Sequence, residues 1–347
     1  MTTLSKAYQK DLINSHPITP IDFGSIDRVP ESHLWSQTNE VYQKIQTDHD
    51  IQEALIPVID LAHLEAMDLI GQACKTWGMF QVINHGVPSD LVKNIESEVQ
   101  RLFELPTHEK CKVLRSASRL GGYGSAQISP YFDKAMWHEG FTIMGSCVED
   151  AKILWPNDFQ RFCDTIDAYR NQMKLLAHKL VTMILQTLDA TQEEMNWATS
   201  TLDAQNNLQL NSYPSCPNPS SVVGLASHTD TRLLTILHQS SGINGLEIFV
   251  EGLGWKPVRP VENAFVVNVG DLLHIFSNAT FPAVYHRVMV NQSKHRTSVA
   301  YFYSPLVESM VAPSSKFKNP CFKSLTVKEY LSLKAKSYHK ALSMVRI

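Results

Sequence analysis

The sequence lacks several features that would each define a class of protein. No uncharged apolar run approaches the roughly 20 residues that a membrane-spanning helix needs. None of the six cysteines forms a Cys-x-x-Cys pair, so we expect reduced, mostly buried thiols rather than a zinc ribbon or a thioredoxin-type motif. Basic residues are not in excess, because 31 Lys and Arg stand against 34 Asp and Glu. The resulting formal charge of −3 makes nucleic acid an unexpected partner.

The composition also excludes fibrous and disordered classes. With 347 residues, 44% of them hydrophobic, the chain is long enough to bury a sizeable core. The 15 glycines and 17 prolines are too few for a collagen-like or low-complexity protein. Residues 1–20 are polar, with no apolar core of a secretory signal, and residues 1–55 are expected to form an extended arm. We expect a soluble, cytoplasmic monomer without membrane contact.

Two periodicities divide the chain. Before residue 200, strand-like runs at 56–61 and 80–83 alternate with helical patterns at 64–77 and 89–105, and an apolar stripe at 162–183 predicts one long amphipathic helix. After about residue 205 the apolar period changes to 2, with Gly and Pro clusters between short β-rich runs. The expected strands are 208–213, 233–238, 246–250, 265–269, 272–276, 284–290 and 297–303.

This pattern predicts a mixed α+β protein. We expect an N-terminal helical cap region at residues 1–200 that includes the long support helix, and a jelly-roll (double-stranded β-helix) core at 201–310. We place a C-terminal helix within 311–347, because Thr326 and Glu329 form a capping box for a helix that reaches roughly residue 344.

A candidate metal site comes from His228-Thr229-Asp230 and from His286, which lies in a later strand-like run. On an extended segment, residues i and i+2 point to the same side, so His228 and Asp230 can bind one ion. Two histidines and one carboxylate form the facial triad of non-haem iron, which leaves other coordination positions open. A catalytic zinc site uses similar ligands, and a His-x-Asp pair alone is a weak signal.

Polar residues on two further strand-like runs suggest an anion site. Arg296 and Ser298 share one face of their run, as do Asn211 and Tyr213 of theirs. A buried guanidinium suits a carboxylate through two charge-assisted hydrogen bonds. The alternatives are a solvated arginine at a sheet edge and a tyrosine that only packs in the core.

Taken together, these motifs resemble the Fe(II)- and 2-oxoglutarate-dependent dioxygenases of plants. The order and spacing of Asn211-Ser-Tyr-Pro-Ser-Cys-Pro217, His228-x-Asp230, His286 and Arg296-x-Ser298 agree with that family. Within the family, the segments 136–143, 267–272 and 340–344 are similar to the gibberellin 3-oxidases, and the resemblance covers the chain from about residue 15 onward. The chain differs from the family pattern at Ala279, at 283–285 and at 303–305.

The resemblance implies roles for the motif residues. His228, Asp230 and His286 would hold Fe(II), Asn211 would contact the 1-carboxylate end of 2-oxoglutarate, and Arg296, Ser298 and Tyr213 would hold its far carboxylate. The reaction would use O2, with ascorbate as a supporting reductant, and would leave succinate and CO2.

The implied activity is 3β-hydroxylation of a C19 gibberellin. The alternatives are oxidation of another gibberellin position (2β, C7 or C20), a flavonoid or other small substrate, and a binding protein without turnover. The irregular segment 119–141 offers candidate substrate contacts, although its aromatic residues would equally suit plain packing. These candidates are Arg119, Tyr123, Tyr131, Phe132 and Trp137.

Overall fold

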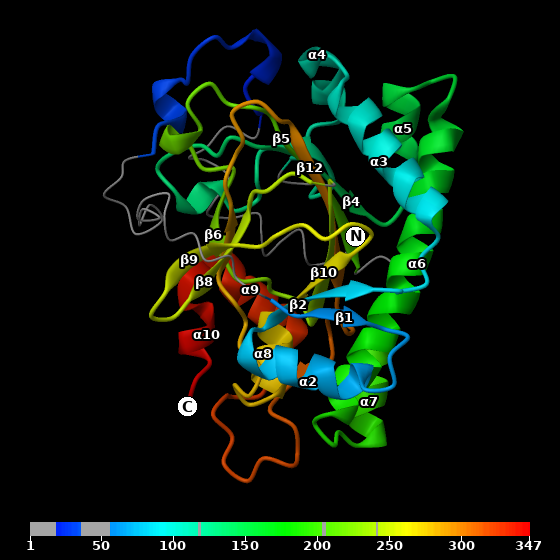
Figure 1. Ribbon diagram of the computed structural model, residues 1–347, viewed down its shortest axis with the longest axis vertical. Coiled ribbons are helices and arrows are strands. Elements are labelled where there is room, and N and C mark those ends of the chain that lie inside the picture. The colour runs from blue at the N-terminus through cyan, green and yellow to red at the C-terminus, as the bar shows by residue number, and fades with distance from the viewer. Residues whose placement is uncertain (1–18, 36–55, 117–118, 203–205, 241) are drawn as a thin grey trace.

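Two β-sheets form the centre of the protein in this computed structural model, which describes residues 19–35, 56–116, 119–202, 206–240 and 242–347 (Figure 1). The larger sheet has eight strands in the order β1-β2-β10-β7-β12-β5-β4-β3, and the smaller has four in the order β6-β11-β8-β9. Buried side chains of both sheets, among them Leu237 and Ile248, belong to one apolar cluster. The jelly roll is therefore confirmed. Its strands are β5 (Asn207–Tyr213), β6 (Leu225–His228), β7 (Leu234–Gln239), β8 (Leu246–Val250), β9 (Gly254–Pro257), β10 (Phe265–Val269), β11 (His286–Val288) and β12 (Arg296–Tyr303).

The N-terminal region is part of the same sheet rather than a separate helical layer. Strands β1 (Val58–Asp60) and β2 (Met79–Ile83) join the sheet through antiparallel pairing of β2 with β10. At the other side, β3 (Gly122–Gly124) and β4 (Glu139–Met144) extend it, because β4 pairs with β5. A domain boundary near residue 200 would therefore separate β4 from β5, although these two strands are hydrogen-bonded to each other. The segment 119–141 was expected to be irregular, but it contains β3 and the first residues of β4, and helix α5 (Val148–Leu154) follows it.

The predicted long support helix is present as α6 (Phe159–Gln186), which runs along one flank of the molecule in Figure 1. Its apolar stripe is buried from Phe162 to Leu180, because it packs on the large sheet and on neighbouring helices. The helices beside it are α2 (Ala66–Thr76), α3 (Ser89–Phe103), α5 and α7 (Gln192–Thr199), and a short helix α4 (Thr107–Lys110) follows α3.

One predicted strand is a helix. Residues 272–276 lie in α8 (Asp271–Phe276), where all four apolar side chains are buried. A short apolar run fits a buried helix as well as a buried strand, so the pattern alone could not distinguish them. The carboxylate of Asp271 accepts hydrogen bonds from Lys334 and Tyr330 of the C-terminal helix, and these bonds fix α8 in place.

The C-terminal helix begins as expected and then breaks. In α9 (Val327–Ser337) both halves of the capping box between Thr326 and Glu329 are formed. The helix ends where Tyr338 takes a positive φ of 45°, and a 3-10 turn leads into α10 (Ala341–Met344). A small sheet of β13 (Met310–Val311) and β14 (Leu325–Thr326) precedes α9.

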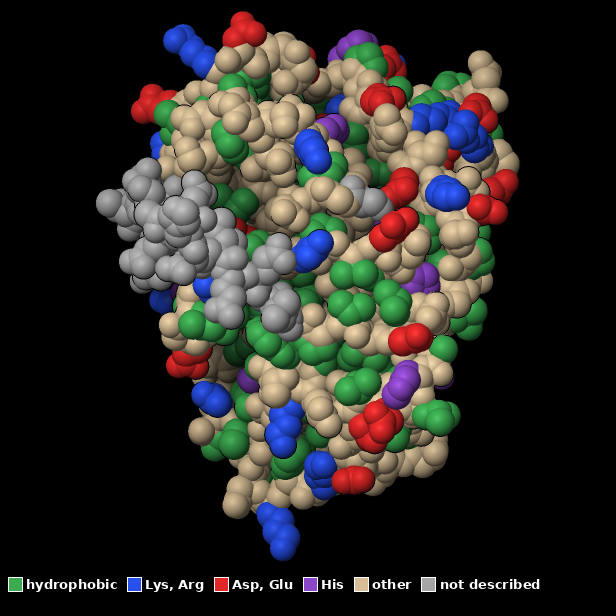
Figure 2. Space-filling model, in the orientation of Figure 1, with side chains coloured by type: hydrophobic (Ala, Val, Ile, Leu, Met, Phe, Trp, Pro, Cys, Tyr) green, Lys and Arg blue, Asp and Glu red, His purple; other side chains and the backbone are tan. Residues whose placement is uncertain are grey.

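Several whole-chain expectations from the sequence can be compared with the structure. In Figure 2, acidic and basic side chains are interspersed over the visible face rather than gathered by sign. Within the described residues, no helix combines the length and the apolar character needed to cross a membrane. All six cysteines are free, and four of them are buried. Of the expected N-terminal arm, residues 1–18 and 36–55 lie outside the described part, and Trp35 is buried against the jelly roll.

Candidate active site

The two histidines of the predicted triad face each other across the small sheet. His228 is the last residue of β6, and antiparallel pairing places His286 of β11 directly opposite it. Asp230 follows two residues later, and its Oδ1 atom lies 3.8 Å from the Nε2 atom of each histidine. Two ligands that each lie about 2.1 Å from one ion can be no more than about 4.2 Å apart, so this spacing suits one shared ion. In the described part of the chain these residues form the one such cluster of His, Cys, Asp or Glu.

Backbone carbonyl groups set the tautomer of both histidines. The Nδ1 atom of His228 lies 2.8 Å from the Ala226 carbonyl oxygen, and Nδ1 of His286 lies 3.2 Å from that of Val284. A carbonyl oxygen only accepts, so each Nδ1 carries the proton and each Nε2 keeps its lone pair. Burial, and next the neighbouring His286 imidazole, lower the pKa of His228 to about 3. Its imidazole is therefore neutral at pH 7, as a metal ligand must be.

The carboxylate of Asp230 is held in its ionised form. Burial favours the neutral acid, but the His286 and His228 imidazoles outweigh it and lower the pKa of Asp230 overall. The Asn268 side chain also lowers it by donating a hydrogen bond to Oδ2 over 3.0 Å. This bond turns Oδ1 toward the histidines. Three ligand atoms of the types that iron prefers therefore converge.

The predicted anion site lies on the large sheet. Antiparallel pairing of β5 with β12 places Arg296 opposite Tyr213 and Ser298 opposite Asn211. The Arg296 side chain is 1% exposed, and its Nη2 donates a hydrogen bond to Gln239 over 2.9 Å. Among the described residues, neither its Nε nor its Nη1 has a hydrogen-bond acceptor. Buried N–H groups without acceptors are costly, and a bound carboxylate would satisfy both.

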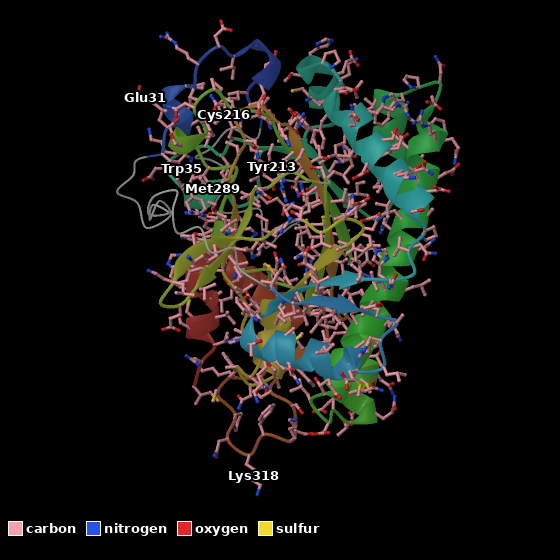
Figure 3. All side chains as sticks on the ribbon, viewed as in Figure 1. Glu31, Trp35, Tyr213, Cys216, Met289 and Lys318 are labelled. Carbon is pink, nitrogen blue, oxygen red and sulfur yellow. The ribbon has the colours of Figure 1, made fainter. Side chains whose placement is uncertain are left out.

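Burial also changes the ionisation of this pair. It lowers the pKa of Arg296, although the nearby Tyr213 opposes the shift, and it raises the pKa of Tyr213. The phenol therefore stays neutral and remains a donor at pH 7, and its ring lies 5.1 Å from the guanidinium carbon. In Figure 3, Tyr213 lies toward the same end of the jelly roll as Trp35 and Cys216.

A pocket connects the metal ligands with the polar face of β5. His228, Asp230 and Asn211 line it, together with residues of the segment 126–131 and of the C-terminal helix. His138 also lines it, and burial lowers the pKa of His138 to about 4, so its ring is neutral at pH 7. The wall therefore combines neutral polar groups with apolar side chains such as Leu331 and Phe302.

Of the five candidate substrate contacts, Tyr131 lies on this pocket. Its ring stacks on Tyr338 with centroids 4.5 Å apart, and its hydroxyl donates to the Ala335 carbonyl over 2.6 Å. Phe132 is outside the pocket lining and packs between Trp35 and Tyr338. These contacts attach the segment around residue 131 to the C-terminal helix.

The other three candidates have structural partners away from the pocket. Tyr123 is fully buried and donates to the Glu139 carboxylate over 2.6 Å. Trp137 is buried as well, and its indole nitrogen donates to the Pro214 carbonyl over 3.1 Å. Arg119 forms an ion pair with a carboxylate of α5. The alternative interpretation of this segment was that its aromatic residues only pack, and this is the role seen for Tyr123, Phe132 and Trp137.

Two cationic residues of the pocket had not been predicted. The Lys334 Nζ atom lies 2.7 Å from both Asp271 and the hydroxyl of Thr229, the residue between two triad ligands. Arg232 also lines the pocket. It follows Asp230 by two residues, the same spacing that joins Asp230 to His228, and this was a signal that the sequence offered. Lys334 gave no such signal, because only the fold brings α9 to the site.

Comparison with protein families agrees with this geometry. The profile of the 2OG-Fe(II) oxygenase superfamily matches residues 204–305. A second profile, described as the N-terminal part of a non-haem dioxygenase in morphine synthesis, matches residues 56–161.

Similar proteins span nearly the whole chain. Gibberellin 3-beta-dioxygenase 1 of Pisum sativum is 45% identical over all of this chain and 94% of its own length. The Arabidopsis thaliana protein of the same name is 43% identical over 97% of both. Among solved structures, JOX2 in complex with 2OG, Fe and JA has a TM-score of 0.76 at 25% identity, covering 93% of this chain and 95% of that one. The rice dioxygenase for auxin oxidation has a TM-score of 0.69 at 23% identity, covering 84% of this chain and all of the other.

Proposed function

Since the chain belongs to the 2OG-Fe(II) oxygenase superfamily, we propose that it is a dioxygenase that hydroxylates a C19 gibberellin at the 3β position. The observation that carries the chemistry is the triad of His228, Asp230 and His286, with a buried arginine across the jelly roll. The observation that carries the substrate is 34–45% identity over nearly the full chain to several gibberellin 3-beta-dioxygenases.

In this proposal the triad binds Fe(II). Both histidines present Nε2 lone pairs and Asp230 presents Oδ1, and this set of two imidazoles and one carboxylate would hold the ion. When bound, Fe(II) together with 2-oxoglutarate and O2 supplies the oxidising power that converts a C–H bond to an alcohol, with succinate and CO2 as co-products. The protein holds the ligands and excludes water.

We assign the far carboxylate of 2-oxoglutarate to Arg296. Its Nε and Nη1 groups lack acceptors among the described residues, and a carboxylate is planar and bidentate as the guanidinium requires. Ser298 and Tyr213 lie beside it as neutral hydroxyl donors. Asn211 lies one residue pair closer to the pocket, where it would contact the other end of the oxo acid.

The remainder of the pocket would orient the gibberellin. Such a ligand is rigid and mostly apolar, so Phe302, Leu331 and the stacked rings of Tyr131 and Tyr338 suit its skeleton. The C–H bond that is held nearest the metal is the one oxidised, so positioning decides which product forms. The proposal includes ascorbate as a supporting reductant and a cytoplasmic monomer, which light scattering and cell fractionation would test.

The test is to incubate the protein with Fe(II), 2-oxoglutarate, O2 and a C19 gibberellin that lacks the 3-hydroxyl. We expect one added oxygen at the 3β position, located by NMR of the product, with one succinate formed per hydroxylation. His286→Ala is the matched inactive control. Oxidation only at 2β, C7 or C20, or turnover only with a flavonoid, would contradict the substrate assignment and leave the cofactor assignment standing.

A further inference from the structure

The inner face of β5 and β12 forms one continuous ladder of side chains. Strand residues two apart lie on the same face, and directly paired residues are neighbours across the strands. One end of the ladder is the Arg296 anion site. Going away from it, the successive pairs are Arg296 with Tyr213, Ser298 with Asn211, Ala300 with Gln209, and Phe302 with Asn207. Ser304 is the next residue in this alternation, just past the end of β12.

A second arginine lies at the opposite end of this ladder. The Nη1 atom of Arg232 donates a hydrogen bond to the Ser304 hydroxyl over 3.2 Å. Ser304 is completely buried, and its own backbone N–H donates to the Asn206 side chain over 3.1 Å. The guanidinium is therefore fixed to the body of the fold. Arg232 is 7% exposed and lines the pocket, two residues after Asp230.

The two arginines are far enough apart to serve different anions. Arg296 and Ser304 are separated by eight residues, which corresponds to roughly 27 Å along an extended strand. The pocket is lined by Asn207, Gln209 and Asn211 of the ladder, and by Asp230 and Arg232. Arg296 is not among its lining residues. The half of the ladder that runs from Asn211 toward Ser304 is therefore available to a ligand other than the one at Arg296.

We propose that Arg232, held by Ser304, binds the carboxylate of the hydroxylated substrate and thereby sets which carbon faces the metal ligands. This inference rests on the proposed function, because a gibberellin is the carboxylate-bearing substrate it supplies. A guanidinium has five N–H donors in a planar fork, so it can hold Ser304 and receive a carboxylate at once. Lys334, the second cation that lines the pocket, forms an ion pair with Asp271 at 2.7 Å.

The experiment compares a gibberellin acid with its methyl ester, which keeps the skeleton and loses the charge. Dissociation constants are measured by equilibrium dialysis, without oxygen, in the presence of Fe(II) and 2-oxoglutarate. The wild type should bind the acid about 10- to 150-fold more tightly than the ester, the equivalent of ~1.5–3 kcal/mol for hydrogen bonds to a charged group. In Arg232→Gln the acid should bind as weakly as the ester, while ester binding stays unchanged. Arg232→Lys should recover part of the preference.

The controls separate this role from a general effect on the site. Arg259→Gln removes an exposed arginine outside the pocket and should leave both dissociation constants unchanged. Arg232→Gln should keep the wild-type iron content and 2-oxoglutarate affinity. If that variant does not fold, Ser304→Ala gives the same comparison by freeing the guanidinium, and it should reduce the preference for the acid.

The outcomes distinguish the two proposals. A preference for the acid that survives in Arg232→Gln, or in Ser304→Ala where Arg232→Gln does not fold, would overturn the role of Arg232 and leave the hydroxylation intact. If the wild type neither binds nor oxidises any gibberellin, the proposed function fails and this inference fails with it. Selective loss of acid binding, together with a changed product distribution from the same acid, would support it.

Discussion

Replacing Arg296 by lysine tests the 2-oxoglutarate site most directly. The side chain is 1% exposed, one of its nitrogens is bonded to Gln239, and Nε and Nη1 have no acceptor within the described structure. A lysine keeps the charge but cannot present a planar fork to a carboxylate. Loss of one charge-assisted hydrogen bond costs about 1.5–3 kcal/mol, so the dissociation constant of 2-oxoglutarate should rise roughly 10- to 150-fold.

Thermal unfolding gives a readout that does not require turnover. A ligand present at 100 times its dissociation constant stabilises the native state by about 2.7 kcal/mol, and a 100-fold weaker site retains only ~0.4 kcal/mol at the same concentration. The iron-loaded Arg296→Lys protein should therefore lose most of the stabilisation by 2-oxoglutarate, whereas Arg259→Lys, an exposed arginine, should keep it. Identical 2-oxoglutarate titrations of wild type and Arg296→Lys would refute the assignment of the far carboxylate to this residue.

The remaining predictions concern the metal ligands and the pH dependence of stability. His228→Ala, Asp230→Ala and His286→Ala should each fold but lose iron and turnover, and metal analysis showing near-normal iron in two of the three would disprove the triad. Asn268→Ala should weaken Fe(II) binding roughly 10- to 100-fold, because Asn268 orients Asp230, and an unchanged Fe(II) titration would exclude this role. Burial lowers the pKa of His138 to about 4, so between pH ~6.5 and 4 the unfolded chain binds the extra proton and the metal-free protein loses stability as the pH falls. In urea titrations over this pH range, His138→Gln should remove up to ~3 kcal/mol of that loss in the free energy of unfolding. If the free energy of unfolding depends on pH in the variant as it does in the wild type, the lowered pKa of His138 is contradicted.

Much of the fold could be predicted because its patterns are strong. The stripe of α6 repeats over many turns, and a long period-3.6 pattern is hard to satisfy in another way. The change to a period of 2 after residue 205 correctly indicated the jelly roll. The errors lie in short elements. The run at 272–276 forms helix α8, and the strands β3 and β4 fall in a segment without a clear period.

The motif spacing identified the residues that could form a site, and pairing brought them together. His228 and Asp230 were predicted to share one face because they are two residues apart. That His286 lies opposite His228 depends on the register of β11 against β6, which no spacing reveals. The pairing of Arg296 with Tyr213 likewise depends on the register of β12 against β5.

The aromatic segment shows the limit of composition as a guide to a pocket. Tyrosine and tryptophan are residue types that substrate pockets use. Here, however, the Tyr123 hydroxyl donates its hydrogen bond to Glu139, and the Trp137 indole N–H donates to the Pro214 carbonyl. The composition of a segment does not say which face of each side chain is turned to the cavity.

The sequence by itself determined the chemistry, because the ligand types and their order along the chain are local properties that survive without coordinates. It also determined the two classes of secondary structure, since periodicity is written residue by residue. Only the tertiary structure decided which cations reach the pocket. Lys334 arrives on a helix about a hundred residues from Thr229, and Arg232 is fixed by Ser304 at the far end of the ladder. Contacts between distant segments depend on how the whole chain packs, and the substrate pocket is made of such contacts.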